Sequence, residues 1–113
     1  MVLGFKIDIS EKNSTPIIQV RGEIDAYTTK ELSESLSTAI EDGDKAVILN
    51  LNDVNFIDSV GLGVIASKAE VLTEKGRALK VVCNNNSVKR IFDIAGLDTV
   101  IQLDETDDTA LTE

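Results

Sequence analysis

The most informative absence in this 113-residue chain is histidine, of which it has none. Without histidine, a serine or cysteine nucleophile has no imidazole base, and most zinc sites lose a ligand. The chain also has only one tyrosine, three phenylalanines and no tryptophan, too few rings for the aromatic platform that a sugar substrate favours. We therefore predict that the chain is not an enzyme, with no catalytic residue, no metal ligand and no cofactor.

Cysteine is nearly absent as well, since Cys83 is the only one. A single cysteine cannot form an internal disulfide, and its apolar surroundings predict a small core residue. No apolar run approaches the roughly 20 residues of a transmembrane helix, and the N-terminus lacks the basic and apolar regions of a signal peptide. We expect a cytoplasmic protein.

Positive charge is scarce, because 11 basic residues face 20 acidic ones and the net charge is −9. This balance disfavours binding to nucleic acid or to an anionic membrane, both of which need a basic surface. It suits a basic or mixed protein partner. The length predicts one domain over residues 1–113, acting as a monomer, with an acidic tail at about 104–113 that either holds one short helical turn or frays.

Two stretches of alternating apolar and polar residues, Phe5–Ser10 and Pro16–Arg21, flank a polar turn over residues 11–14. This pattern predicts an antiparallel hairpin with Phe5, Ile7 and Ile9 on one half-buried face. Lys45–Leu51 is nearly continuously apolar, which is typical of a central strand buried on both faces. Two more short strands are predicted over Ala78–Cys83 and Val100–Leu103.

Helical patterns follow the strands. Gly22–Ala26 breaks the second strand, and Thr28 and Glu31 resemble a capping box, with Tyr27 and Leu32 placed as its hydrophobic staple. The next helix is predicted to run to Lys75 and stop at Gly76, and Ser87 is expected to cap a shorter one, whose apolar face would hold Val88, Ile91, Phe92 and Ala95. The order of elements predicts an α/β fold with a mixed sheet of 4–5 strands and helices mainly on one face.

The stretch Asn55–Ile65 places Ser59 where a buried strand passes into a helix. Serine is favoured as an N-cap there, beside backbone N–H groups without partners. A nucleophile elbow is excluded, because Ile57 stands where glycine is needed and histidine is absent. A phosphate cradle formed with Gly61 and Gly63 lacks a Walker lysine. Each glycine costs roughly 1 kcal/mol in a helix, so we expect something to approach this backbone closely.

Apolar residues fall on two sides of the same helix. Leu62, Ile65, Ala66, Ala69 and Leu72 form a stripe that should face the sheet. Val60, Val64 and Val71 lie nearly opposite. They either pack laterally against a neighbouring helix or form a partly exposed docking surface beside Ser59.

Two aspartates precede helices in the same way as Ser59. Asp25 and Asp58 each follow a strand, and parallel strands end at one edge of a sheet. We expect both carboxylates to lie near Ser59. They either complement the helix dipoles or belong to a binding surface.

Three motifs together resemble the bacterial anti-sigma factor antagonists, the single-domain STAS proteins. The motifs are Gly22-Glu23-Ile24-Asp25-x-x-Thr28, Asp58-Ser59-x-Gly61-Leu62-Gly63, and Val88-Lys89-Arg90-Ile91-Phe92-Asp93-x-x-Gly96-Leu97. The resemblance spans essentially the whole chain and implies a STAS-like fold. It also implies that Ser59 is a phosphorylation site and that Asp25 and Asp58 border a partner-binding surface.

The resemblance implies a partner-switching mechanism. The unphosphorylated form would bind an anti-sigma factor, an ATP-dependent serine kinase, and so release a sigma factor. Phosphorylation of Ser59 would abolish binding, and a metal-dependent serine phosphatase would restore it. The predicted contact surface comprises Asp25, Asp58, Ser59, Val60, Gly61, Gly63 and Val64. Val60 departs from the small or hydroxylated residue usual in relatives. A nucleotide-binding STAS domain that regulates another pathway is the alternative.

Overall fold

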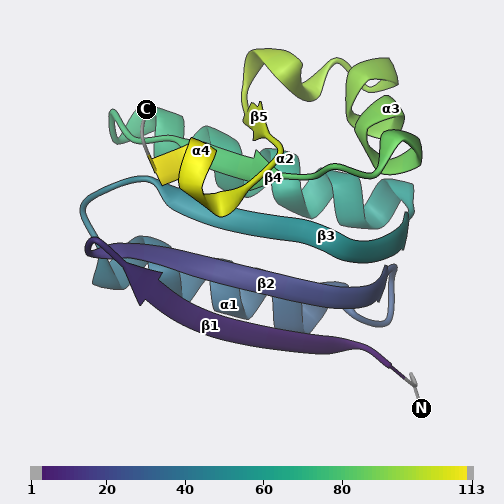
Figure 1. The fold of residues 1–113 in the computed structure, drawn as a ribbon, viewed down its shortest axis with the longest axis horizontal. Helices are drawn as coiled ribbons and strands as arrows, with labels where there is room; N and C mark the ends of the chain where they lie inside the picture. Colours follow the sequence, from purple (N-terminus) through teal and green to yellow (C-terminus); the bar gives the residue numbers. More distant parts are fainter. Residues whose placement is uncertain (1–3, 112–113) are drawn as a thin grey trace.

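The computed structural model describes residues 4–111, apart from the side chain of Asp98, and is built on one five-stranded sheet (Figure 1). β1 pairs antiparallel with β2, and each later neighbouring pair is parallel. The mixed sheet predicted from the sequence is therefore confirmed, with β3 at its centre. The strands lie in chain order: β1 (Lys6–Lys12), β2 (Thr15–Ile24), β3 (Val47–Ile57), β4 (Leu79–Val82) and β5 (Gln102–Asp104).

The β1–β2 hairpin turns on two residues, a tighter connection than the predicted turn over residues 11–14. Asn13 and Ser14 have φ values of 54° and 63°, the positive sign that a type I′ turn requires. Lys12 pairs with Thr15 across the turn. The predicted half-buried face of β1 extends only part of the way, since Ile9 is 60% exposed.

β2 is longer than predicted, because Gly22–Ile24, the first part of the apparent break at Gly22–Ala26, still belongs to the strand and contains only an irregularity. The register against β3 shifts between Gln19 and Arg21 and again between Gly22 and Glu23. Gly22 has a φ of 104°, and a Cβ there would lie 3.0 Å from the carbonyl oxygen of Gly4. The shifts bring Ile24 into the core as the last residue of the strand.

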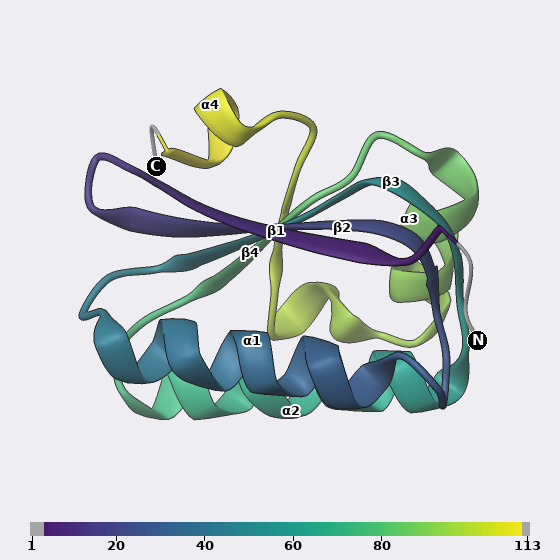
Figure 2. The ribbon, with the colours of Figure 1, turned by 90° about the horizontal axis from the view of Figure 1, so that it is seen from below.

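Two long helices, α1 (Thr29–Asp42) and α2 (Ser59–Glu74), lie side by side on one face of the sheet (Figure 2). In the predicted sheet-facing stripe of α2, Ile65, Ala69 and Leu72 are buried, as expected. Leu62 and Ala66, at the border of the stripe, are only half-buried. With the inward side chains of the strands, the two helices form the main core. The buried apolar residues are Leu32, Leu36, Ala39 and Ile40 of α1 and Ile65, Ala69 and Leu72 of α2.

The third helix, α3 (Asn86–Ile94), precedes a short 3-10 turn at Leu97–Thr99. Ser87 was expected to cap α3, but the cap is Asn85, whose side chain accepts hydrogen bonds from the N–H groups of Ser87 and Val88. Asn85 lies two residues before Ser87, so α3 begins before the residue that was expected to cap it. The predicted apolar face is confirmed for the buried Val88 and Phe92 and the half-buried Ile91, whereas Ala95 is exposed.

The acidic tail forms a helix and docks. α4 (Asp107–Leu111) lies on the face of the sheet opposite α1 and α2 (Figure 2). The amide of Asn50 donates to Asp107 Oδ1 at 2.9 Å, and Lys80 Nζ donates to the carbonyl of Ala110 at 2.7 Å. The acidic tail was predicted either to hold one short helical turn or to fray, and within the described residues it holds the turn. Residues 1–3 and 112–113 of the predicted domain lie outside them. Ala110 completes a small apolar cluster with Ile17, Ile48 and Val82.

Candidate functional site

The candidate site lies at the edge of the sheet where β2 and β3 end. Ile24 and Ile57 are Cα partners in the parallel ladder and are the last residues of their strands. The N–H of Asp58 then donates to the carbonyl of Ile24 at 3.0 Å. Asp25 and Asp58 follow these two isoleucines directly, so the structure brings both aspartates to one edge beside the start of α2, as the sequence indicated.

Asp58, and not Ser59, is the N-cap of α2. The backbone of Asp58 is extended, and its Oδ1 accepts a hydrogen bond from the N–H of Gly61 at 2.9 Å. This bond is the N-cap interaction that aspartate supplies as readily as serine. Ser59 is consequently the first helical residue, and it is exposed. Its hydroxyl is free to be modified without removing the cap.

The two glycines of the first turn differ in their surroundings. Gly61 is buried, and a Cβ there would lie 2.5 Å from Ile24 Cγ2 and 3.3 Å from the Ile24 carbonyl oxygen. A Cβ on Gly63 would meet nothing within 4 Å. The close approach inferred from the sequence is therefore internal at Gly61, while Gly63 leaves the helix backbone open to solvent.

The valines opposite the core stripe of α2 are accessible to differing degrees. Val60 is 48% exposed and Val71 is 38% exposed, while Val64 between them is half-buried. Lateral packing does not cover Val60, which stands next to Ser59. A partly exposed apolar strip thus begins at the candidate site and runs along α2.

Asp25 organises the loop that joins β2 to α1. Its Oδ1 accepts hydrogen bonds from the N–H groups of Tyr27 at 2.9 Å and Thr28 at 3.2 Å. The hydroxyl of Thr28 donates to the Glu23 carbonyl at 3.0 Å and accepts from the N–H of Asp25 at 2.9 Å. This is an Asx turn closed by a buried threonine, and it fixes the backbone of the loop.

The predicted capping box and hydrophobic staple at this loop are both wrong. Thr28 makes no side-chain cap bond to α1, because its hydroxyl is used across the loop. Tyr27 does not pack on Leu32 and is instead 86% exposed. The pattern Asp-x-Tyr-Thr could have been interpreted as an Asx turn, but the same Thr-x-x-Glu spacing also fits a capping box.

Two exposed rings at the same edge were not predicted as site residues. Tyr27 lies two residues after Asp25. Phe56, the penultimate residue of β3, pairs with Glu23 and is 48% exposed. Exposed aromatic rings are enriched in surfaces that bind another protein.

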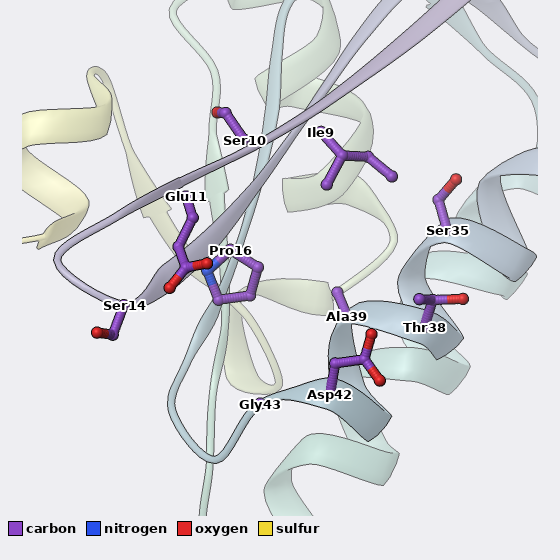
Figure 3. Close-up of a pocket in the computed structure, with 10 residues that line it drawn as sticks. All are labelled: Ile9, Ser10, Glu11, Ser14, Pro16, Ser35, Thr38, Ala39, Asp42 and Gly43. Carbon is purple, nitrogen blue, oxygen red and sulfur yellow. The ribbon is translucent and has the colours of Figure 1, made fainter.

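A surface pocket of about 350 Å³ lies away from this edge, between the hairpin and the end of α1 (Figure 3). Its lining carries the carboxylates of Glu11 and Asp42 and no basic residue. Such a lining does not favour the phosphates of a nucleotide. None of the residues that line this pocket was predicted to form the site. The lining residues are Ile9, Ser10, Glu11, Ser14, Pro16, Ser35, Thr38, Ala39, Asp42 and Gly43.

Within residues 4–111, no three acidic or cysteine side chains gather closely enough to hold a metal ion. In the same range, no helix has the length and apolar character needed to cross a membrane.

Comparison with known proteins gives consistent matches. The family model described as STAS domain matches residues 6–110. An anti-sigma-B factor antagonist of Staphylococcus epidermidis is 33% identical over 88 residues, which cover 78% of this chain and 82% of that protein. The crystal structure of an anti-sigma factor antagonist from Mycobacterium paratuberculosis superposes with a TM-score of 0.86 at 28% identity, covering 96% of this chain and 92% of the other.

The fold is also shared with the phosphorylated form of the Bacillus cell fate determinant SpoIIAA. That structure superposes with a TM-score of 0.67 at 20% identity, covering 96% of each chain. At this identity the likeness concerns the fold alone.

Proposed function

The chain belongs to the STAS-domain family, and from that membership we propose that it is an anti-sigma factor antagonist switched by phosphorylation of Ser59. In the unphosphorylated state it binds an anti-sigma factor that is an ATP-dependent serine kinase, and the sigma factor is released. Phosphorylation ends the binding, and a metal-dependent serine phosphatase reverses it. The chain acts as a binding module and not as an enzyme, in the cytoplasm.

One observation carries this proposal most strongly. Ser59 is an exposed first residue of a helix whose cap is supplied by its neighbour Asp58. A kinase can therefore reach the hydroxyl, and a phosphate added there meets the free N–H groups and the positive end of the helix dipole. We expect the domain to stay folded when it is phosphorylated. Curated relatives named anti-sigma-B factor antagonists support the choice of partner.

The release would come from electrostatics within the complex. A phosphate carries about −1.5 to −2 charges at pH 7 and would lie close to the Asp58 carboxylate. Two unit charges about 6 Å apart repel by about 0.7 kcal/mol in water and by roughly 3 kcal/mol at an effective dielectric near 20. When a partner covers the pair, the repulsion energy therefore rises by about 2 kcal/mol. This increase corresponds to about a thirtyfold loss of affinity. The exposed Val60 adds steric conflict if the partner closes tightly.

The test uses purified anti-sigma factors from the genome that encodes this chain. We expect one of them to bind the wild type and, with ATP, to phosphorylate it. Ser59→Ala should bind without being released by ATP, and Ser59→Asp should bind at least about tenfold more weakly. Ser59→Asn separates charge from size and should bind like the wild type.

Ser87→Ala is the matched control, because Ser87 is also exposed in the first turn of a helix with an Asx cap. It should remain a substrate and keep full affinity. Phosphorylation of Ser59→Ala, or equal affinities for Ser59→Asp and Ser59→Ala, would overturn the proposal. If the release is electrostatic, a higher salt concentration should reduce the difference in affinity between Ser59→Asp and Ser59→Ala.

A further inference from the structure

The exposed ring of Tyr27 has no assigned role, and the loop that carries it is unusually well fixed. We propose that Tyr27 is the apolar anchor by which this chain docks on its anti-sigma factor, and that Asp25 is a positioning residue that presents the ring. The inference deepens the proposed function and rests on it, since the partner is the anti-sigma factor named there.

The first support is the contrast between a free side chain and a fixed backbone. The Tyr27 side chain is 86% exposed, yet its N–H is held by Asp25 at 2.9 Å. The next residue, Thr28, is only 4% exposed and ties the loop back to the carbonyl of Glu23. A ring on a fixed backbone loses little conformational freedom on binding, and tyrosine is among the residues that dominate interface energies.

The second support is the use of the Asp25 carboxylate. The same oxygen, Oδ1, accepts from both Tyr27 and Thr28, so the carboxylate already serves the loop in the free chain. The amide oxygen of an asparagine would accept the same two hydrogen bonds. Asp25 therefore contributes through its geometry, and its negative charge is not required for this role.

The surroundings of the ring indicate the chemistry of the partner surface. Glu23, the penultimate residue of β2, is exposed, and Asp58 is partly exposed at the same edge, in a chain with a net charge of −9. The complementary surface is an apolar depression for the ring with basic residues around it. Val60 and Ser59 belong to the same edge, so docking by Tyr27 would bring the partner over the phosphorylation site.

The test measures affinity by calorimetry for the purified anti-sigma factor that binds the wild-type chain. Tyr27→Ala should weaken binding by about thirtyfold, as expected for an interface anchor, and Tyr27→Phe should bind nearly as the wild type. Asp25→Ala should weaken binding, whereas Asp25→Asn should bind nearly as tightly as the wild type. The double variant with Asp25→Ala and Tyr27→Ala should lose little more than Tyr27→Ala alone.

Ile9→Ala is the matched control, because Ile9 is also apolar and 60% exposed but lies on the hairpin, in the pocket away from the edge. It should bind as the wild type. If Tyr27→Ala keeps full affinity while Ser59→Asp loses it, the anchor is refuted and the proposed function stands. If Asp25→Asn binds as weakly as Asp25→Ala, the positioning role is refuted in favour of a charge contact. If no anti-sigma factor binds the wild type, the proposed function itself fails.

Discussion

The two glycines at the start of α2 offer a sharp test of the geometry at the site. Replacement of either one by alanine removes the conformational freedom of glycine in a helix, which stabilises the fold by up to roughly 1 kcal/mol. Only at Gly61 does the new methyl group meet the core, 2.5 Å from Ile24 Cγ2 and 3.2 Å from Ile57 Cγ2. Both neighbours are branched side chains and are buried, so neither has room to move away from the new methyl group.

The steric cost of a methyl group in such a packed position is about 1–3 kcal/mol. Gly61→Ala should therefore lose about 1 kcal/mol of net stability, while Gly63→Ala should gain up to about 1 kcal/mol. Urea denaturation followed by far-UV circular dichroism measures both variants on the same scale. The difference between them isolates the steric contribution. A Gly61→Ala variant as stable as Gly63→Ala would show that a methyl group at Gly61 does not clash with Ile24 and Ile57.

Three further predictions concern the core and the cap. Ile65→Ala, at a fully buried site, should cost about 2–5 kcal/mol in urea denaturation, and Leu62→Ala, at a half-buried site, should cost less; the reverse order would mean that α2 is rotated. Asp58→Ala should lose about 0.5–2 kcal/mol by removing the cap of α2, while Asp58→Asn should be nearly neutral; equal losses would show that the bond to Gly61 is not the cause. Burial raises the pKa of the Cys83 thiol, so its contribution to stability is complete below the ordinary thiol pKa and is lost as pH rises through the raised value. A thiol reagent at pH 8 should react with Cys83 only as fast as the chain unfolds, and rapid labelling of the native protein would contradict this.

Much of the fold was predictable because its apolar patterns are local. The alternation in Phe5–Ser10 and the continuous run in Lys45–Leu51 indicated an edge hairpin and a central strand, and both are present. The prediction ended β2 too early, because register shifts after Gln19 and Gly22 destroy the two-residue period that reveals a strand. A bulge is stabilised by the neighbouring strand, so the sequence of β2 alone does not encode it visibly.

The site was predicted in outline but not in its internal bonding. The rule that parallel strands end at one edge was enough to place Asp25, Asp58 and Ser59 together. The capping residue was misassigned at Ser59 and Ser87, and Thr28, although it is the N-cap of α1, makes no side-chain capping bond. At each of these positions, two residues near the helix start carry oxygens of similar reach. The choice depends on backbone torsions that tertiary contacts decide, such as the hydrogen bond from Thr28 to the Glu23 carbonyl.

The hydrogen bond from the Asp58 N–H to the Ile24 carbonyl has a consequence for how such chains diverge. It joins the ends of β2 and β3, so the loop that bears Tyr27 and the helix that begins at Ser59 are held in a fixed position relative to each other by one common backbone frame. The side chains of Tyr27 and Val60 project from this frame and belong to neither core cluster. After gene duplication, substitutions at Tyr27 and Val60 can therefore change which partner is bound. The backbone, the cap at Asp58 and the position of Ser59 stay the same.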